Sequence, residues 1–180
     1  MLHSTIDPEQ ERLNAWLRER HETQFRNSLT QGTQLLSQRR ADEALPFLER
    51  AHKLKPDHPE AALNLGGAYI MTGRYGLAVN ILEMAVARNP DYAQLWVNLG
   101  AAYLGDPVTA TDDRQQRALA AFQRALDLDP MARSVSYNMG LIHRDRGEVE
   151  QAIAAFRRAV LTDPDDRDAW RLLERLSATR

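Results

Sequence analysis

The sequence predicts an all-α protein built as a one-dimensional stack of helix pairs, closed by a single capping helix. Three observations lead to this prediction. A set of residue types recurs at intervals of 34 residues, with one interval of 40. Within each unit the apolar residues fall on stripes of helical period. Glycine or proline stands where most of the predicted helices end or begin.

The repeat is clearest in its spacing. Gly32, Gly66 and Gly100 are 34 residues apart, and Gly140 follows after 40. The glycine interval lengthens after Gly100, whereas the matching alanine interval lengthens before Ala118. An insertion of six residues therefore lies between these two positions. Three other series follow the same steps: Ala44, Ala78, Ala118 and Ala152; Leu48, Leu82, Phe122 and Phe156; Pro56, Pro90, Pro130 and Pro164.

The stripes of the second unit explain how two helices pack together. Leu65, Gly66 and Tyr69 share one helical face, and Ala78 and Leu82 share a face of the next helix. Small residues let the two helices approach closely while the larger ones interdigitate. Each pair leaves one apolar side open, which the following pair covers, so the units form a stack.

This pattern resembles the tetratricopeptide (TPR) repeat over about residues 25–178. The resemblance implies a right-handed superhelix of antiparallel helix pairs. It also implies that the first helix of each pair lines a concave surface, which binds a protein or peptide. The third unit carries the family signature in full: Trp96, Leu99, Gly100, Tyr103, Ala118, Phe122, Ala125 and Pro130.

The repeat boundaries predict two parts, an N-terminal helical extension at residues 1–24 and a TPR domain at 25–178. The domain holds repeats at 25–58, 59–92, 93–132 with the insertion, and 133–166, followed by a capping helix at 167–178. Trp170, Leu173 and Leu176 should face inward from this last helix and cover the fourth repeat.

The N-terminal extension begins with a helix start signal. Asp7 can cap the helix, Pro8 suits its first position, and Gln10 stands where a capping box requires it. We expect this helix to run, continuous or only kinked, into the first repeat. Its apolar stripe should pack on that repeat through Trp16; the alternative is docking on a second copy or a partner. The stripe consists of Leu13, Trp16 and Leu17.

The insertion in the third repeat is predicted to be a solvated acidic loop over residues 105–113. Gly105 should stop the preceding helix, and Thr111 or Asp112 should cap the next one. Its aspartates lack the spacing and closing glutamate of a calcium loop: Asp106, Asp112 and Asp113.

Composition excludes several classes of protein. Hydrophobic residues make up 43% and charged residues 27%, which is enough for a core. The net charge of −2 and the pI of about 6.2 argue against a general nucleic-acid binder. The lack of cysteine excludes disulfides and thiolate metal sites. We expect no signal peptide, no membrane span and a cytoplasmic location. Arginine outnumbers lysine 21 to 2, which we take to indicate a bacterial source.

No enzyme, cofactor or metal is predicted. The five histidines are scattered, and no nucleophile elbow, phosphate loop or metal motif appears. His143 replaces the aromatic residue found at Tyr69 and Tyr103, and we interpret it as a packing residue rather than a ligand.

The resemblance places the binding site on the first helices. Asn64, Asn98 and Asn138 each precede a repeat glycine by two residues, so they form a line that Thr30 breaks in the first repeat. This line resembles the asparagine ladder of O-GlcNAc transferases, which binds extended peptides by their main chain. The alternative is a bond between neighbouring repeats. The line is flanked by apolar Leu63, Val97 and Tyr137, and by a basic end of Arg144, Arg171 and Arg175.

The arginines of this basic end have two interpretations. In the first, they form a pocket for an acidic group of the ligand. In the second, Asp145, Asp168 and Glu174 neutralise them as a solvated surface.

The favoured function is therefore a peptide-binding scaffold that works without catalysis. The alternative is a homo-oligomeric assembly component that uses the N-terminal helix. A co-chaperone that grips chaperone tails fits less well. Its clamp of Lys, Asn, Asn, Lys and Arg is kept here only at Asn64, and the other four places hold Leu29, Thr33, Gln94 and Asn98.

Overall fold

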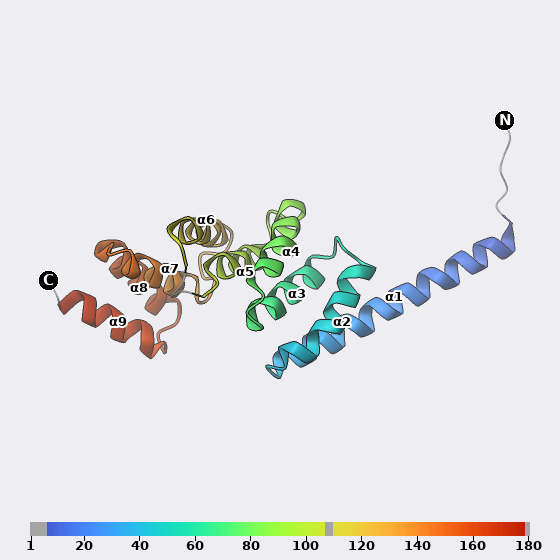
Figure 1. The fold of residues 1–180 in the computed structure, drawn as a ribbon, viewed down its shortest axis with the longest axis horizontal. Helices are drawn as coiled ribbons and strands as arrows, with labels where there is room; N and C mark the ends of the chain where they lie inside the picture. Colours follow the sequence, from blue (N-terminus) through green and yellow to red (C-terminus); the bar gives the residue numbers. More distant parts are fainter. Residues whose placement is uncertain (1–6, 107–109, 179–180) are drawn as a thin grey trace, which may run out of the picture.

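The computed structural model describes residues 7–106 and 110–178, and this part of the chain contains nine helices and no strand (Figure 1). Each helix packs against the next in the sequence, which produces an elongated stack with its termini at opposite ends. The predicted all-α helical-repeat fold is thus confirmed. The helices are α1 Pro8–Ser37, α2 Ala41–Leu54, α3 Pro59–Met71, α4 Tyr75–Arg88, α5 Ala93–Leu104, α6 Asp112–Leu128, α7 Val135–Asp145, α8 Val149–Thr162 and α9 Arg167–Ala178.

One contact recurs in every helix pair and explains the repeat glycines. A Cβ added at Gly100 would lie 2.5 Å from the ring of Phe122, and one at Gly140 would lie 2.7 Å from the ring of Phe156. Gly32 and Gly66 face leucines equally closely in the first two pairs. Both phenylalanines are fully buried. The helices therefore approach too closely for any other residue at these positions.

The turns inside the pairs need a left-handed residue. Gly73 and Gly147 have φ angles of 72° and 74°. In the first pair Arg39 takes the same conformation, with φ of 61°, although it is not a glycine. A non-glycine residue in this region is mildly strained.

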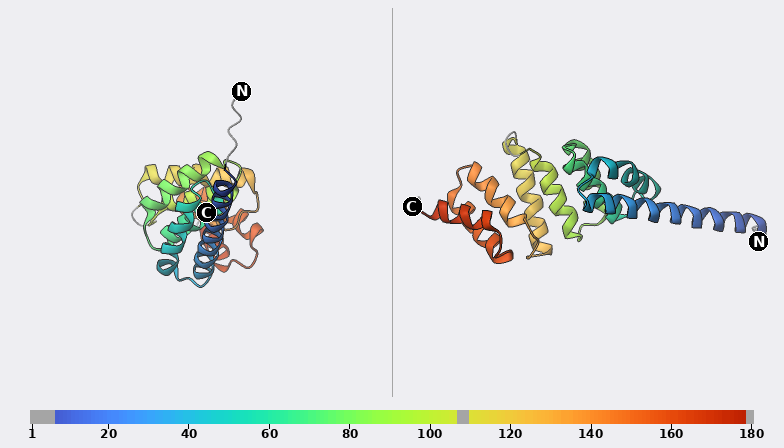
Figure 2. Two further views of the ribbon diagram at one scale, coloured as in Figure 1. Left: turned by 90° about the vertical axis from the view of Figure 1, so that its right-hand side faces the viewer. Right: turned by 90° about the horizontal axis from the view of Figure 1, so that it is seen from below.

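Helix α1 is one continuous helix of 30 residues, and its first half lies beyond the stack (Figures 1 and 2). Phe25, Ser28 and Gly32 are buried, whereas residues 11–20 are all exposed. Helix α2 has 14 residues, so at about 1.5 Å per residue it can cover only about half of α1. The predicted packing of Trp16 on the first repeat is therefore wrong: its side chain is 52% exposed.

The start of α1 follows the prediction in part. The Asp7 carboxylate accepts a hydrogen bond from the Glu9 backbone N–H at 3.1 Å, and Pro8 is the first helical residue. Gln10 does not complete a capping box, because its side chain donates to Asn14 Oδ1 at 3.2 Å instead.

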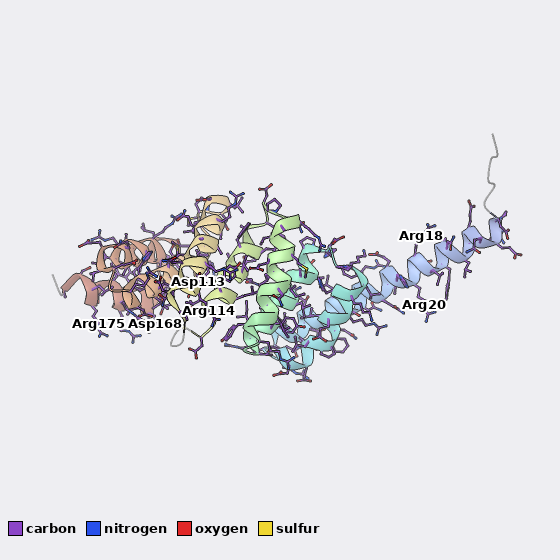
Figure 3. The ribbon with its side chains drawn as sticks, turned by 45° about the horizontal axis from the view of Figure 1, so that its top comes forward. Arg18, Arg20, Asp113, Arg114, Asp168 and Arg175 are labelled. Atoms are coloured by element: carbon purple, nitrogen blue, oxygen red, sulfur yellow. The ribbon has the colours of Figure 1, made fainter. Side chains whose placement is uncertain are left out.

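The insertion lengthens both the loop and helix α6, which has 17 residues. Gly105 ends α5 with a φ of 59°, and Thr111 caps α6 by accepting from the Arg114 N–H at 3.4 Å. Asp112 is the first residue of α6 and pairs with Arg146 near the end of α7. Residues 107–109 of the predicted loop, including Pro107, lie outside the described residues. Figure 3 shows Asp113 and Arg114 at this start of α6.

Candidate functional site

The candidate site is the surface formed by the first helix of each pair. It is built from the second half of α1 and from α3, α5 and α7, with α9 at the far end. Helix α1 packs on α3, and α3 packs on α5, so the side chains of these three first helices are neighbours. Helix α7 is joined to them through α6, on which it packs.

The asparagine line joins neighbouring repeats. Asn64 Nδ2 donates to Thr33 Oγ1 at 2.9 Å, and Asn98 Nδ2 donates to the Leu63 carbonyl at 3.3 Å. Both asparagines are half-buried. For these two residues the structure contains the bond between repeats that was the alternative interpretation.

Asn138 differs from the other two asparagines. Within the described part of the chain its side chain makes no hydrogen bond, although it is also half-buried. Asn98 on α5 bonds back to α3, but no equivalent bond runs from Asn138 on α7 back to α5 in the described chain. The insertion lies between α5 and α7, in the loop after α5 and the start of α6. The fourth repeat thus begins with its asparagine unbonded.

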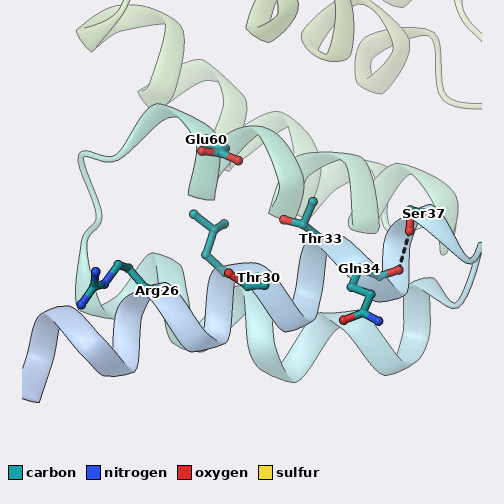
Figure 4. A pocket seen from close by; sticks show the side chains of 7 residues that line it. Arg26, Thr30, Thr33, Gln34, Ser37 and Glu60 are labelled. Carbon is teal, nitrogen blue, oxygen red and sulfur yellow. Dashed lines mark hydrogen bonds between the residues drawn. The ribbon is translucent and has the colours of Figure 1, made fainter.

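A pocket of about 500 Å³ lies at the first-repeat end of this surface, between α1 and α3 (Figure 4). From the sequence we placed Thr30 on the asparagine line and Leu29 and Thr33 at two places of the chaperone clamp, but we did not single out the other lining residues. Arg26, Thr30 and Gln34 follow each other at four-residue steps along α1, which is the helical signal that could have identified them. The lining residues are Arg26, Leu29, Thr30, Thr33, Gln34, Ser37 and Glu60.

The apolar flank of the line is half-buried rather than fully exposed. Leu63 and Val97 pack partly against the core, and the Tyr137 ring lies edge-on to Phe156 with centroids 5.8 Å apart. Burial raises the pKa of Tyr137, with Asp168 and Asp166 adding to the effect. Leu104, the last residue of α5, is buried in the core that α6 forms with α5 and α7.

The basic end consists of arginines that already have partners. Arg144 pairs with Asp145 at 2.6 Å, and Arg171 pairs with Asp168 at 2.6 Å. Arg175 follows Arg171 by one turn of α9, and Figure 3 shows Arg175 and Asp168 on this helix. These ion pairs match the neutralised surface that was the second interpretation of the basic end, and exposed pairs of this kind contribute little to stability.

His143 lies on the opposite side of α7 and is not only a packing residue. Its Nδ1 lies 2.6 Å from a carboxylate oxygen of Glu148, in the turn before α8. The pKa of Glu148 is lowered, first by the hydrogen bond from Arg146 and then by the one from His143. The two bonds fix this turn to the end of α7.

No group of three or more metal-ligating side chains comes together in the described residues. None of the helices in that same part is long and apolar enough to cross a membrane. The surface carries hydrogen-bonding amides, half-buried apolar flanks and paired charges.

These features define a class: a helical-repeat scaffold that interacts with other proteins. Two tetratricopeptide repeat models match the chain, at residues 35–104 and 113–169, and together they span more than half of it. The chain belongs to the tetratricopeptide repeat family, whose repeats are generally non-catalytic. No curated protein matches the sequence significantly.

Solved structures agree with this fold. A thermophilic TPR protein from Thermus thermophilus superposes with a TM-score of 0.72 and 27% identity, covering 86% of this chain and 82% of its own. MamA gives 0.69 and 24%, covering 82% and 83%. The APC/C hetero-tetramer Cut9–Hcn1 gives 0.74 and 20%, covering 84% of this chain and 29% of its own.

Proposed function

We propose that the chain is a non-catalytic scaffold whose first helices bind an extended segment of a partner protein. The line of Asn64, Asn98 and Asn138 is the observation that carries the proposal. The three amides stand at the same position of three successive repeats, which suits a ligand that runs along the stack.

The hydrogen bonds between repeats leave these amides able to bind a ligand. A primary amide has two N–H donors and an oxygen that accepts two bonds. Asn64 and Asn98 each use one donor in the bonds to Thr33 and Leu63. These bonds hold the amides in one orientation, which reduces the entropy lost when a peptide main chain pairs with them.

Two ends of the surface supply specificity in this proposal. The pocket between α1 and α3 would take one ligand side chain, with Arg26 and Glu60 at its edge. At the other end Arg144, Arg171 and Arg175 would take an acidic group, which would compete with Asp145 and Asp168. The contribution of this end should be small, because both existing ion pairs are exposed.

The test uses a peptide selected on the native chain from a displayed library of random peptides. Its affinity is measured by calorimetry for the native chain, Asn138→Ala, the triple Asn64→Ala, Asn98→Ala, Asn138→Ala variant, and the control Asn80→Ala, whose residue is exposed on α4. Each lost hydrogen bond costs about 0.5–1.5 kcal/mol, so the triple variant should bind at least about tenfold more weakly.

Asn138→Ala separates binding from stability. Asn64 and Asn98 hold the repeats together, so their loss also lowers stability, whereas Asn138 has no such bond to lose. Weaker binding by Asn138→Ala at an unchanged melting temperature supports the ligand role. Unchanged affinity in the triple variant would remove the asparagine line from the site.

A second candidate function is self-association through α1. The exposed side chains of Leu13, Trp16 and Leu17 support it, because they form an apolar stripe on a helix that nothing else in the described chain covers. Figure 3 shows Arg18 and Arg20 on this same projecting part of α1. A mass that rises with protein concentration in light scattering would support this candidate, and a constant monomer mass would exclude it.

A further inference from the structure

The space between neighbouring second helices is filled by side chains in one repeat and open in the next. A groove of about 360 Å³ lies between α6 and α8, with α7 as its floor. The equivalent place one repeat earlier lies between α4 and α6 over α5. Each residue that lines the groove between α6 and α8 has an equivalent in the space between α4 and α6, found by stepping back one repeat in the sequence.

In the third repeat large side chains fill this place. The Trp96 indole N–H donates to the Pro90 carbonyl at 2.8 Å. The Tyr103 hydroxyl donates to Glu83 at 2.6 Å, and the Arg117 guanidinium lies 4.1 Å from the Tyr103 ring and pairs with Glu83 at 2.6 Å.

In the fourth repeat all four of these side chains are replaced, three of them by smaller ones. Ser136 stands for Trp96 and His143 stands for Tyr103; Gln123 and Gln151 stand for Glu83 and Arg117. His143 turns to Glu148, and Gln123 donates to Asp127 at 2.8 Å, so neither rebuilds the missing cluster. The groove is lined by Gln123, Leu126, Ser136, Met139, His143, Gln151, Ala154, Ala155 and Arg158.

The opposite wall still has the shape that fits an indole. Ala155 corresponds to Ala121, the small residue of the repeat that does contain a tryptophan. The second repeat lacks a tryptophan as well, with Ala62 at that place, but there Ile81 stands opposite and supplies the bulk. In the fourth repeat Ala155 adds no bulk to the α8 wall, and on the α6 wall Leu126 replaces Val86, which adds one methylene; a groove remains.

The hydrogen-bond acceptor of the indole is also present. Pro90 accepts from Trp96, and Pro164 accepts from Trp170 at 3.0 Å. The equivalent carbonyl here, that of Pro130, accepts from Arg158 at 3.2 Å. A carbonyl has two lone pairs, so Pro130 can also accept from an indole that enters the groove.

The same chain carries an exposed tryptophan that lacks such a partner. Trp16 is 52% exposed, the Arg20 guanidinium lies 5.2 Å from the centroid of its ring, and its N–H makes no hydrogen bond to any described residue. Leu13, Trp16 and Leu17 stand at positions i, i+3 and i+4, so they share one face of α1. Helices that dock in apolar grooves use this spacing.

We propose that the groove between α6 and α8 binds the Trp16 side chain of a second copy of this chain. The proposal names the receiving site for the self-association put forward above, and it is independent of the asparagine line. Because the donor and the receptor lie at opposite ends of the molecule, the contact is head-to-tail and continues from copy to copy.

Two variants each remove one side of this contact. Trp16→Ala removes the donor, and Ser136→Trp fills the groove with the residue that the third repeat uses. The control Leu161→Ala removes an apolar side chain that is 77% exposed on α8 but does not line the groove. In sedimentation over a concentration series the native chain and the control should associate, and both variants should stay near the 20.4 kDa monomer.

Mixing the two variants gives the decisive result. Trp16→Ala keeps the groove and Ser136→Trp keeps the donor, so the mixture should form a 1:1 dimer that grows no further. If Ser136→Trp does not fold, Ala155→Ile, which copies Ile81, closes the groove in its place.

Each other outcome overturns part or all of the proposal. Association that survives Ser136→Trp but not Trp16→Ala leaves α1 as the donor and excludes this groove. Association that survives Trp16→Ala excludes α1 as the occupant. A native chain that stays monomeric excludes both the groove and the self-association, while the asparagine line is tested separately by peptide binding.

Discussion

The two ends of the molecule carry similar apolar stripes but use them differently. Leu13, Trp16 and Leu17 lie on α1, and Trp170 and Leu173 lie on α9. At the C-terminal end the Trp170 N–H bonds the Pro164 carbonyl, Leu173 is buried, and the helix closes the stack. At the N-terminal end the side chains of the stripe are exposed, and the first half of α1 projects beyond the other described helices (Figure 2).

The difference shows what an amphipathic stripe does and does not determine. The stripe indicates that a face will be covered, but the repeat register decides whether the chain itself covers it. Trp170 stands six residues after a repeat proline, as Trp96 does, whereas the residue six before Trp16 is Gln10. The two tryptophans in register, Trp96 and Trp170, each bond the carbonyl of their repeat proline, whereas Trp16 is out of register and makes no such bond in the described chain.

The largest expected effect comes from deleting one end or the other. Removing residues 167–180 should expose the inner face of α8 and lower the melting temperature by many degrees or cause aggregation, because terminal repeats need a polar outer face. Removing residues 1–20 should leave the melting temperature unchanged. Circular dichroism on both deletions tests this, and similar melting temperatures would mean that α9 does not cap the stack.

A matched pair of substitutions tests the same contrast with one side chain. Trp170→Ala should lower the free energy of unfolding by about 1–3 kcal/mol, less than for a fully buried tryptophan because Trp170 is 44% exposed. Trp16→Ala should stay within about 0.5 kcal/mol of the native value. Urea unfolding at low protein concentration measures both, and an equal loss would show that α1 packs on the stack.

Gly140 and Gly76 allow the same comparison inside the repeats, because one faces a packed helix contact and the other faces open space. A Cβ at Gly140 meets the Phe156 ring, whereas one at Gly76 in α4 meets nothing within 4 Å. Gly140→Ala should cost about 1–3 kcal/mol through overpacking. Gly76→Ala should stabilise by up to about 1 kcal/mol through helix propensity. Opposite signs in chemical denaturation support the register, and equal signs contradict it.

The smallest effect concerns His52, on the second helix of the first repeat. Burial lowers its pKa, and nearby Arg88 lowers it further, while Asp57 opposes them. Its Nδ1 is buried without a hydrogen-bond partner in the described chain. Below about pH 6.5 the His52 imidazole is protonated in the unfolded chain but stays neutral to lower pH in the folded chain. The free energy of unfolding therefore falls as the pH falls.

His52→Val inserts the residue found at the equivalent Val86. The variant should gain roughly 1 kcal/mol or less at about pH 8 and more at about pH 5.5, with a flatter slope between them. Melting curves at the two pH values measure the slope, and a slope as steep as in the native chain would assign the pH dependence to other groups.

The sequence predicted the stack because its information is local and repeated. Gly100 and Phe122 recur with their counterparts at intervals of 34 residues, with one interval of 40, so each copy supports the others. The sequence left two interpretations of the asparagine line, ligand binding and a bond between neighbouring repeats. It could not decide between them, because whether Asn98 reaches Leu63 depends on how closely α3 and α5 approach. That distance changes after the insertion, and the sequence contains no measure of it.

The open groove was not predicted for a different reason. Ser136 and His143 are ordinary residues by themselves. Their effect appears only when four replacements at distant positions are compared with the third repeat, and when Ala155 fails to compensate. A single side chain does not create such a groove, because neighbouring helices usually fill it.

Hydrogen exchange of the native chain at low and high protein concentration tests the central claim, that the stack ends near Phe25 and that the helix beyond it serves for docking. At low concentration the amides of residues 8–20 should exchange quickly while those of α2 to α8 stay protected. At high concentration residues 8–20 and the helices around Ser136 should become protected together. Protection of residues 8–20 at every dilution, or protection that appears only on α3 and α5, would contradict the account.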